Sequence, residues 1–327
     1  MRKLFGKKVF NVLKLLVGFN MCLFIIHYNA VKLTQMRKGD SISRGSRDDY
    51  YPVPTTMATP INEVFEQRRR LVQDVCRNDN VPLVEKIDYG RILVDPAHSI
   101  MYCQVEKVGS SNWLRTFLIL AGEFSANDTI PWSSIYKVYD HYKRLSQYLH
   151  PERLQLLQQY KKFMFVRHPF NRLLSAYVNK FEQQPSMELI AEMLKTLGVT
   201  PASNSSSVLT FPDFVRYLIM TKDSTETWNI HYKPIYYLCY PCNITYDIIG
   251  HLETVTRDSA YILNLMSADF EYPNFVPART NSSRSDNLRK YFSTLTKEQI
   301  RELYNIYEKD FKLFGYEIPS YLNLTKA

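Results

Sequence analysis

The sequence predicts an α/β fold in three layers, with helices on both faces of a central parallel sheet. Two stretches show the same order of a short apolar strand, a polar turn and an apolar helix. Strands at 92–94 and 100–105 precede a helix at 112–120, and a strand at 162–166 precedes a helix at 170–181. Strands that alternate with helices favour a parallel sheet, because parallel neighbours need a long crossover between them.

Signals for helix starts and stops place three further helices. One begins near Val64, and Pro151 stands in the first turn of a second helix that begins at His150. Residues 296–299, Thr-Lys-Glu-Gln, form a capping box for a third helix, which stops at Gly315. The apolar face of the first of these helices comprises Phe65, Leu71, Val72 and Val75.

The N-terminal part of the chain is predicted to hold the protein in a membrane. Basic residues precede a largely apolar run at 9–31, and crossing a bilayer takes roughly 20 such residues. Basic residues before a span favour a cytosolic N-terminus. A cleaved signal peptide is the alternative, although no convincing cleavage site follows. We therefore expect a cytosolic tail at 1–8, a transmembrane signal-anchor at 9–31, a lumenal stem at 32–62 and a globular domain at 63–327.

Two features agree with a lumenal location for this domain. Five Asn-x-Ser/Thr sequons are candidate glycosylation sites: Asn127, Asn204, Asn243, Asn281 and Asn323. Outside the span, an even number of cysteines suggests disulfides, with three possible connectivities: Cys76, Cys103, Cys239 and Cys242. The last two could instead be half of a zinc site, but no second Cys-x-x-Cys or histidine pair completes it.

The charge balance points to an anionic partner without identifying it. The chain has 41 lysines and arginines against 32 aspartates and glutamates. Most of the surplus lies in the tail and stem, so recognition of a polyanion requires a local basic cleft. Candidate rim residues for such a cleft are Arg279, Arg284, Arg289 and Lys290.

The first candidate motif is the loop Lys107-Val108-Gly109-Ser110-Ser111-Asn112, which leaves a strand and enters a helix. Such a loop directs several backbone N–H groups at one point, where the helix dipole adds partial positive charge. The lysine and the two serines make the loop suitable for a phosphate or sulfate group. It lacks the Walker A pattern, which argues against a P-loop kinase. An ordinary strand–helix turn with an exposed lysine is the alternative.

The second candidate motif begins with Arg167 at the end of a strand and reaches Ser175 in the following helix. An arginine and a serine in these positions can converge on one phosphate, and the guanidinium fork binds phosphate bidentately. The alternative is that Arg167 and Arg172 pair with carboxylates.

Together, the two motifs resemble those of Golgi carbohydrate sulfotransferases. Lys107–Trp113 resembles their 5′-phosphosulfate loop, and Arg167–Ser175 resembles their 3′-phosphate motif. The chain is similar to the family of chondroitin and dermatan 4-O-sulfotransferases, N-acetylgalactosamine 4-sulfotransferases and the human-natural-killer-epitope sulfotransferase. The likeness runs from about Arg91 to Tyr316. Departures from the family pattern are Glu106, His168, Asn171 and Tyr232.

The resemblance implies a P-loop-like sulfotransferase fold and a donor, 3′-phosphoadenosine 5′-phosphosulfate (PAPS), used without a metal. Lys107 would stabilise the leaving phosphate oxygen, since sulfuryl transfer by analogy depends on positioning and electrostatics. Val108, Gly109, Ser110, Ser111 and Asn112 would hold the 5′ end. Arg167 and Ser175 would hold the 3′-phosphate. Trp113 is interpreted as a core side chain more readily than as a platform for adenine.

The acceptor hydroxyl must lose a proton, so we expect a general base. His231 is the first candidate because it lies in a family-like motif and because imidazole titrates near neutral pH. His168 is the second and Glu106 the third. A structural role is the alternative for each of them.

The resemblance also suggests the acceptor and the compartment. We expect a glycan, chondroitin or dermatan, and a single-pass type II Golgi membrane protein with a lumenal domain and no nucleic-acid partner. A sulfotransferase for terminal sugars of glycoproteins and a catalytically inactive glycan-binding protein are alternatives. A Golgi glycosyltransferase would share the anchor and the sequons, but many such enzymes use Asp-x-Asp, which is absent here.

Overall fold

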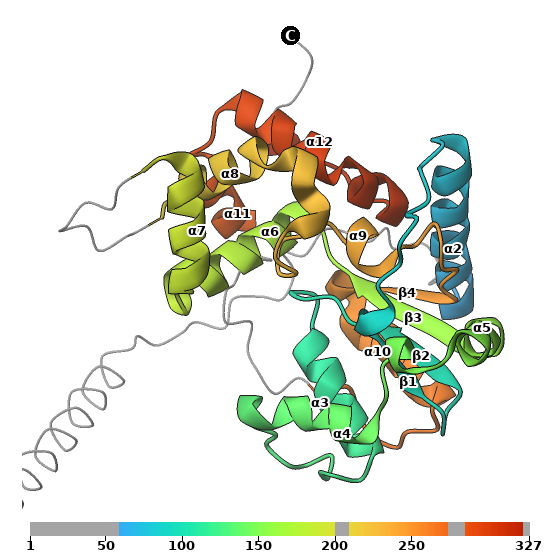
Figure 1. Cartoon of the computed structure of the whole chain (residues 1–327). Coiled ribbons are helices and arrows are strands. Elements are labelled where there is room, and N and C mark those ends of the chain that lie inside the picture. The colour runs from blue at the N-terminus through green and yellow to red at the C-terminus, as the bar shows by residue number, and fades with distance from the viewer. Residues whose placement is uncertain (1–58, 200–208, 274–284, 323–327) are drawn as a thin grey trace, which may run out of the picture. The chain divides into compact units, whose positions relative to one another are not determined.

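The computed structural model describes residues 59–199, 209–273 and 285–322 (Figure 1). Within these residues the core is a four-stranded sheet in which β2, β3 and β4 are parallel and β1 pairs antiparallel with β2. The prediction of a parallel sheet therefore holds for three strands. The edge strand differs because the short link between β1 and β2 allows a hairpin but no crossover. The strands are β1 (Ile92–Asp95), β2 (Ile100–Cys103), β3 (Lys161–Val166) and β4 (Ile248–His251).

Helices cover both faces of this sheet, as the three-layer prediction requires. On one face Trp113 of α3 (Ser110–Leu120) contacts Tyr102 of β2 and Phe163 of β3. Cys103 follows Tyr102 in the strand and so points to the opposite face. There it forms a disulfide with Cys239 of α9 (Tyr236–Cys239). Other helices around the sheet are α2 (Ile61–Asn78), α4 (Val138–His141), α5 (His150–Gln159) and α10 (Val255–Leu265).

A second group of helices encloses its own apolar cluster, and α6 leads into it from the end of β3 (Figure 1). Every residue of α6 is buried. The long helix α12 joins the two clusters, because Phe311 packs in the helical cluster and Phe314 packs in the sheet cluster. This group comprises α6 (Pro169–Tyr177), α7 (Met187–Leu197), α8 (Phe211–Met220), α11 (Ser285–Phe292) and α12 (Lys297–Phe314).

Most local predictions are confirmed, with three corrections. Thr296 caps α12 and Gly315 ends it with φ at 68°, and α5 begins at His150. The predicted helix at 170–181 stops being α-helical at Val178, where a π-helix (Val178–Gln183) follows. The strand predicted at 100–105 ends at Cys103. Leu71 was predicted to lie on the apolar face of α2, but its side chain is 36% exposed.

All four cysteines of the domain are oxidised, as expected, and the structure settles their connectivity. Cys76 of α2 pairs with Cys242, and Cys103 of β2 pairs with Cys239. The Cys-x-x-Cys pair thus joins two different elements and leaves no thiolate for a zinc ion at this position. Sequence separations of 166 and 136 give large loops, which in a chain-entropy model stabilise the fold by about 4–5 kcal/mol each.

Several predictions concern residues outside the described ranges. The tail, the anchor and most of the stem lie there, as do Asn204, Asn281, Asn323, Arg279 and Arg284. Among the described residues, no helix combines the length and the apolar character that a bilayer span requires.

Two sequons lie within the described ranges, and they differ in environment. Asn127 is exposed in the segment that follows α3. Asn243 is half-buried, and its side-chain amide exchanges two hydrogen bonds of 3.1 Å with the backbone of Val84. Glycosylation of either asparagine remains a prediction.

Candidate active site

The two predicted motifs converge at one edge of the sheet. β2 and β3 are parallel neighbours, with Cys103 opposite Met164, so the loops that follow them leave from the same edge. The guanidinium of Arg167 donates a hydrogen bond of 3.1 Å to the backbone carbonyl of Lys107. Lys107 and Arg167 are 60 residues apart in sequence. Their direct contact confirms the prediction that the two motifs adjoin at the carboxyl ends of the strands.

The loop after β2 has an unusual backbone at two positions. Lys107 has φ at 70° and Gly109 has φ at 89°, both in the left-handed region. A lysine there costs about 1 kcal/mol, so its conformation is held by the surroundings. Gly109 also lies too close to Tyr272 for a side chain, because an added Cβ would lie 2.9 Å from the tyrosine oxygen. The hydroxyl of Tyr272 donates to the Gly109 carbonyl at 2.9 Å and fixes the turn from which α3 begins.

The ammonium group of Lys107 lies among other cations. Its Nζ donates a hydrogen bond of 3.0 Å to Oδ1 of Asn179, which is a neutral group. Burial, followed by the nearby charges of Arg167 and Lys180, lowers the pKa of Lys107 from 10.5 to about 7. An anion placed beside these groups would reverse the electrostatic part of that shift. The surroundings of Lys107 are therefore suited to an anionic ligand.

Arg167 and Arg172 belong to the same motif but have different roles. Both are buried, with exposures of 5% and 1%. The guanidinium of Arg172 donates to three backbone carbonyls, at distances of 2.7–3.1 Å: Glu106, Ile230 and Lys233. Among the described residues Arg172 forms no ion pair with a carboxylate, contrary to the alternative considered from the sequence. Arg172 instead connects the end of β2 to the segment that carries His231.

The remaining predicted donor-binding residues surround the start of α3 or line α6. Ser110 is buried, and Ser111 and Asn112 are half-buried in the first turn of α3. Oδ1 of Asn112 accepts a hydrogen bond of 3.1 Å from Arg115. Ser175 is 4% exposed in α6.

Val108 and Trp113 have their side chains in the core. Both are fully buried. The side chain of Val108 is therefore not available to a ligand. Trp113 packs among aromatic rings, as its interpretation as a core residue expects: Tyr102, Phe117, Phe163, Phe165 and Tyr272.

His231 has the geometry of a neutral base. Oδ1 of Asn229 accepts a hydrogen bond of 3.1 Å from the backbone N–H of His231, which identifies that atom as oxygen. The imidazole Nδ1, 2.8 Å from the same oxygen, must then be the protonated nitrogen. Nε2 is left as a proton acceptor. Burial, followed by the charges of Lys180 and Lys107, lowers the pKa of His231 to about 3, so the ring is uncharged at neutral pH.

The other two candidate bases have structural contacts. His168 packs against Phe311 and Tyr316, and its Nε2 donates to the carbonyl of Glu317 at 3.0 Å. Burial lowers the pKa of His168 to about 4. Glu106 forms an ion pair with Arg91, with a separation of 2.5 Å between nitrogen and oxygen. His231 and Glu106 both lie within electrostatic range of Lys107, but the carboxylate of Glu106 is already paired with Arg91.

Three residues of this site were not singled out from the sequence. Asn179 and Lys180 lie in the π-helix that continues α6, and π-helices are often associated with functional sites. No local pattern predicts a π-helix here. Tyr272 lies 163 residues from its partner Gly109, so only the tertiary structure reveals it.

Of the predicted basic rim, the described residues Arg289 and Lys290 are exposed on α11.

Comparison with known proteins identifies the family. A model of the sulfotransferase family matches residues 90–317, which include both motifs and His231. Carbohydrate sulfotransferase 11 of Rattus norvegicus is 33% identical over 278 residues, 80% of this chain and 78% of the relative. Carbohydrate sulfotransferase 10 is 37% identical over 282 residues in Gallus gallus and 36% over 283 residues in Homo sapiens, in each case covering 79% of this chain and 77% of the relative. No solved structure matches the chain. The chain belongs to the sulfotransferase family and is a PAPS-dependent sulfotransferase.

Proposed function

We propose that this protein transfers a sulfuryl group from PAPS to a hydroxyl of a glycan, with N-acetylgalactosamine of chondroitin or dermatan as the acceptor. The observation that carries the proposal is the contact between Arg167 and Lys107, which joins two anion-binding motifs into one site. The names of the relatives support a carbohydrate acceptor. The choice of sugar rests on the resemblance of the motifs.

The residues present fit a donor with phosphate groups at two ends. The start of α3 supplies backbone N–H groups and the hydroxyls of Ser110 and Ser111 for the 5′ end. Arg167 and Ser175 would hold the 3′-phosphate. Glu106, which precedes Lys107 in the chain, is already paired with Arg91. The site thus carries the net positive charge that such a donor needs.

Lys107 and His231 would act on the two sides of the transferred group. PAPS supplies the sulfuryl group and a phosphate that must leave with increased negative charge. Lys107, in its protonated form, stabilises that charge. Nε2 of His231 accepts the proton of the attacking hydroxyl, while Asn229 holds the ring in the required tautomer. No metal ion is part of this proposal.

The direct test uses the full-length protein in detergent, radiolabelled PAPS and three acceptors. These are desulfated chondroitin, desulfated dermatan and a glycoprotein with neutral terminal N-acetylgalactosamine. We expect label in the first two. Label in the glycoprotein alone would favour a sulfotransferase that acts on terminal sugars of glycoproteins. If no glycan became labelled although the protein still bound PAPS, the result would favour the inactive glycan-binding protein.

The role of His231 is tested by His231→Gln. Loss of the base should reduce kcat by about 10²–10⁴-fold while leaving donor affinity within a few-fold. A normal kcat would remove His231 from the mechanism.

We further propose a type II Golgi membrane protein with a lumenal domain. The predicted anchor, the sequons and the two disulfides support this location. In sealed Golgi vesicles, residues 63–327 should resist added protease until detergent is present. Digestion without detergent would contradict the topology.

A further inference from the structure

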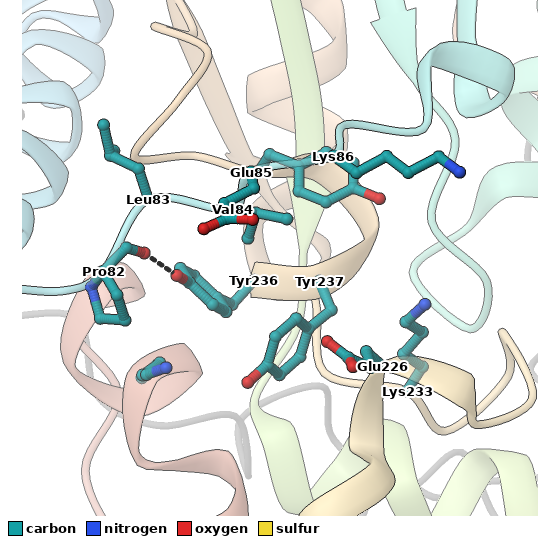
Figure 2. A pocket seen from close by; sticks show the side chains of 11 residues that line it. Pro82, Leu83, Val84, Glu85, Lys86, Glu226, Lys233, Tyr236 and Tyr237 are labelled. Atoms are coloured by element: carbon teal, nitrogen blue, oxygen red, sulfur yellow. Dashed lines mark hydrogen bonds between the residues drawn. The ribbon is translucent and has the colours of Figure 1, made fainter.

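A separate cleft opens beside α9, with a volume of about 540 Å³ (Figure 2). Its walls come from the segment 82–86 before β1, from α9 and from α12. In Figure 2, the rings of Tyr236 and Tyr237 lie between Pro82 on one side and Glu226 with Lys233 on the other. The cleft is large enough for one or two sugar units, and no step of the proposed mechanism uses it.

The cleft combines aromatic and cationic groups. Three lysines line it, Lys86, Lys233 and Lys309, against two glutamates, Glu85 and Glu226. Nζ of Lys309 lies 4.3 Å from the ring centre of Tyr236 and 5.5 Å from that of Tyr237. Within the described residues, none of the three lysines forms an ion pair with a carboxylate. The cleft therefore has one surplus positive charge and tyrosine rings against which an apolar sugar face can pack.

A rigid segment connects this cleft to the active site. Lys233, which lines the cleft, follows His231 by two residues, and the charge of Arg91 acts on both side chains. Arg172 holds the segment by the carbonyls of Ile230 and Lys233. Two residues span at most about 7 Å, a distance that a disaccharide can bridge.

The next turn of this segment is held equally firmly. The carboxylate of Asp310 in α12 accepts hydrogen bonds from the backbone N–H groups of Ile235 and Tyr236, at 2.7 and 2.9 Å. A glycan whose reacting hydroxyl lies at His231 can therefore extend its neighbouring sugar toward Lys233 and into the cleft.

We propose that this cleft binds a carboxylate-bearing sugar of the acceptor, adjacent to the sugar that is sulfated. One surplus positive charge suits a sugar with a single negative charge. Before sulfation, the carboxylate is the anionic group that such a polysaccharide carries. The inference rests on the proposed function, because it assumes that a glycan is the acceptor.

The test compares desulfated chondroitin with the same polymer after chemical reduction of its carboxyl groups. We compare wild type with Lys309→Gln, and use Lys297→Gln as a matched control on the same helix, since Lys297 is exposed and outside the cleft. For wild type and the control, KM should be about five- to tenfold lower with the carboxylated polymer. For Lys309→Gln this preference should disappear, with kcat and the KM for PAPS unchanged.

A wild-type enzyme that uses both polymers equally would overturn the inference, and so would an unchanged preference in Lys309→Gln. A second variant, Tyr237→Ala, should raise KM for both polymers alike, because it removes a ring and leaves the charges. Failure of the proposed function would look different, since wild type would then sulfate no glycan.

Binding can also be measured without turnover, by titrating an unsulfated chondroitin hexasaccharide into protein saturated with 3′-phosphoadenosine 5′-phosphate. Weaker binding to Lys309→Gln than to Lys297→Gln would support the cleft even if catalysis were absent. Equal binding to these two variants would contradict it.

Discussion

The unit formed by β2, its loop and α3 differs from the unit formed by β3, its loop and α6, although both have the same order of elements. The first unit places a lysine in a left-handed turn, with its ammonium beside a neutral amide. In the second unit every residue of the helix is buried, and Arg172 is bound to three carbonyls. Two similar sequence patterns thus place a lysine beside a neutral amide in one unit and bind an arginine to backbone carbonyls in the other.

This difference teaches that the fate of a basic side chain depends on which groups surround it. Arg172 finds backbone acceptors and becomes part of the framework. Lys107 is buried beside other cations, and both effects lower its pKa. Arg167 lies between these cases, because it contacts the first unit while it belongs to the second. The comparison predicts that substitutions in the two units fail in different ways.

Arg172→Ala should have the largest effect. It removes the donor of three carbonyls, one in a buried and two in part-buried hydrogen bonds, so the free energy of unfolding should fall by about 3–5 kcal/mol. Activity should also fall, since the segment with His231 loses its anchor. Denaturant unfolding measures the first effect. Arg172→Lys, which cannot reach three carbonyls at once, should recover little. Normal stability in Arg172→Ala would contradict the supporting role.

Lys107→Ala should act on turnover rather than on stability. Loss of a charge that stabilises the leaving group should lower kcat by about 10²–10³-fold, with a smaller change in donor affinity. The free energy of unfolding should stay the same or rise slightly, since the variant removes a buried cation. Steady-state kinetics and a melting curve give both answers. If this variant unfolded easily, the two units would not differ as described.

Arg167→Ala should weaken donor binding most. In the proposed function its guanidinium binds the 3′-phosphate, which is remote from the reacting group. The binding free energy of PAPS should therefore become less favourable by about 2–5 kcal/mol. At saturating donor, kcat should be nearly retained. Titration with 3′-phosphoadenosine 5′-phosphate measures the loss directly. An unchanged dissociation constant would exclude Arg167 from the 3′ end.

Asn179→Asp should have the smallest effect, seen as a shift in pH dependence. In the proposed mechanism protonated Lys107 is the active form, and burial lowers the pKa of this lysine to about 7 in the free protein. The rate constant kcat/KM for the donor should therefore fall as pH rises through about 7. A carboxylate beside Nζ favours the charged form and raises this pKa, so the fall should move to higher pH. Asn179→Leu, which lacks both charge and acceptor, should not move it upward. If the two variants had the same pH profile, the residue at position 179 would not influence the pKa of Lys107.

Local sequence determined much of the molecule. The strands, the capping box at Thr296 and the stop at Gly315 follow from patterns within a few residues, and the structure has them nearly where they were expected. The motif residues Lys107 and Arg167 could be chosen for the same reason, because a strand that ends in a loop and a helix start is a local feature. Their proximity could also be predicted, because loops that follow neighbouring parallel strands lie at the same edge of the sheet.

Only the tertiary structure decided the remainder, because those contacts join residues far apart in the chain. The cysteine pairing, the three acceptors of Arg172 and the contact of Tyr272 with Gly109 span 58 or more residues. The conformation of Asn179 depends on a π-helix with no sequence signature, and the cleft beside α9 is built from four separate segments. Local propensity acts over one or two turns, whereas burial and hydrogen bonding select partners by position in the folded chain.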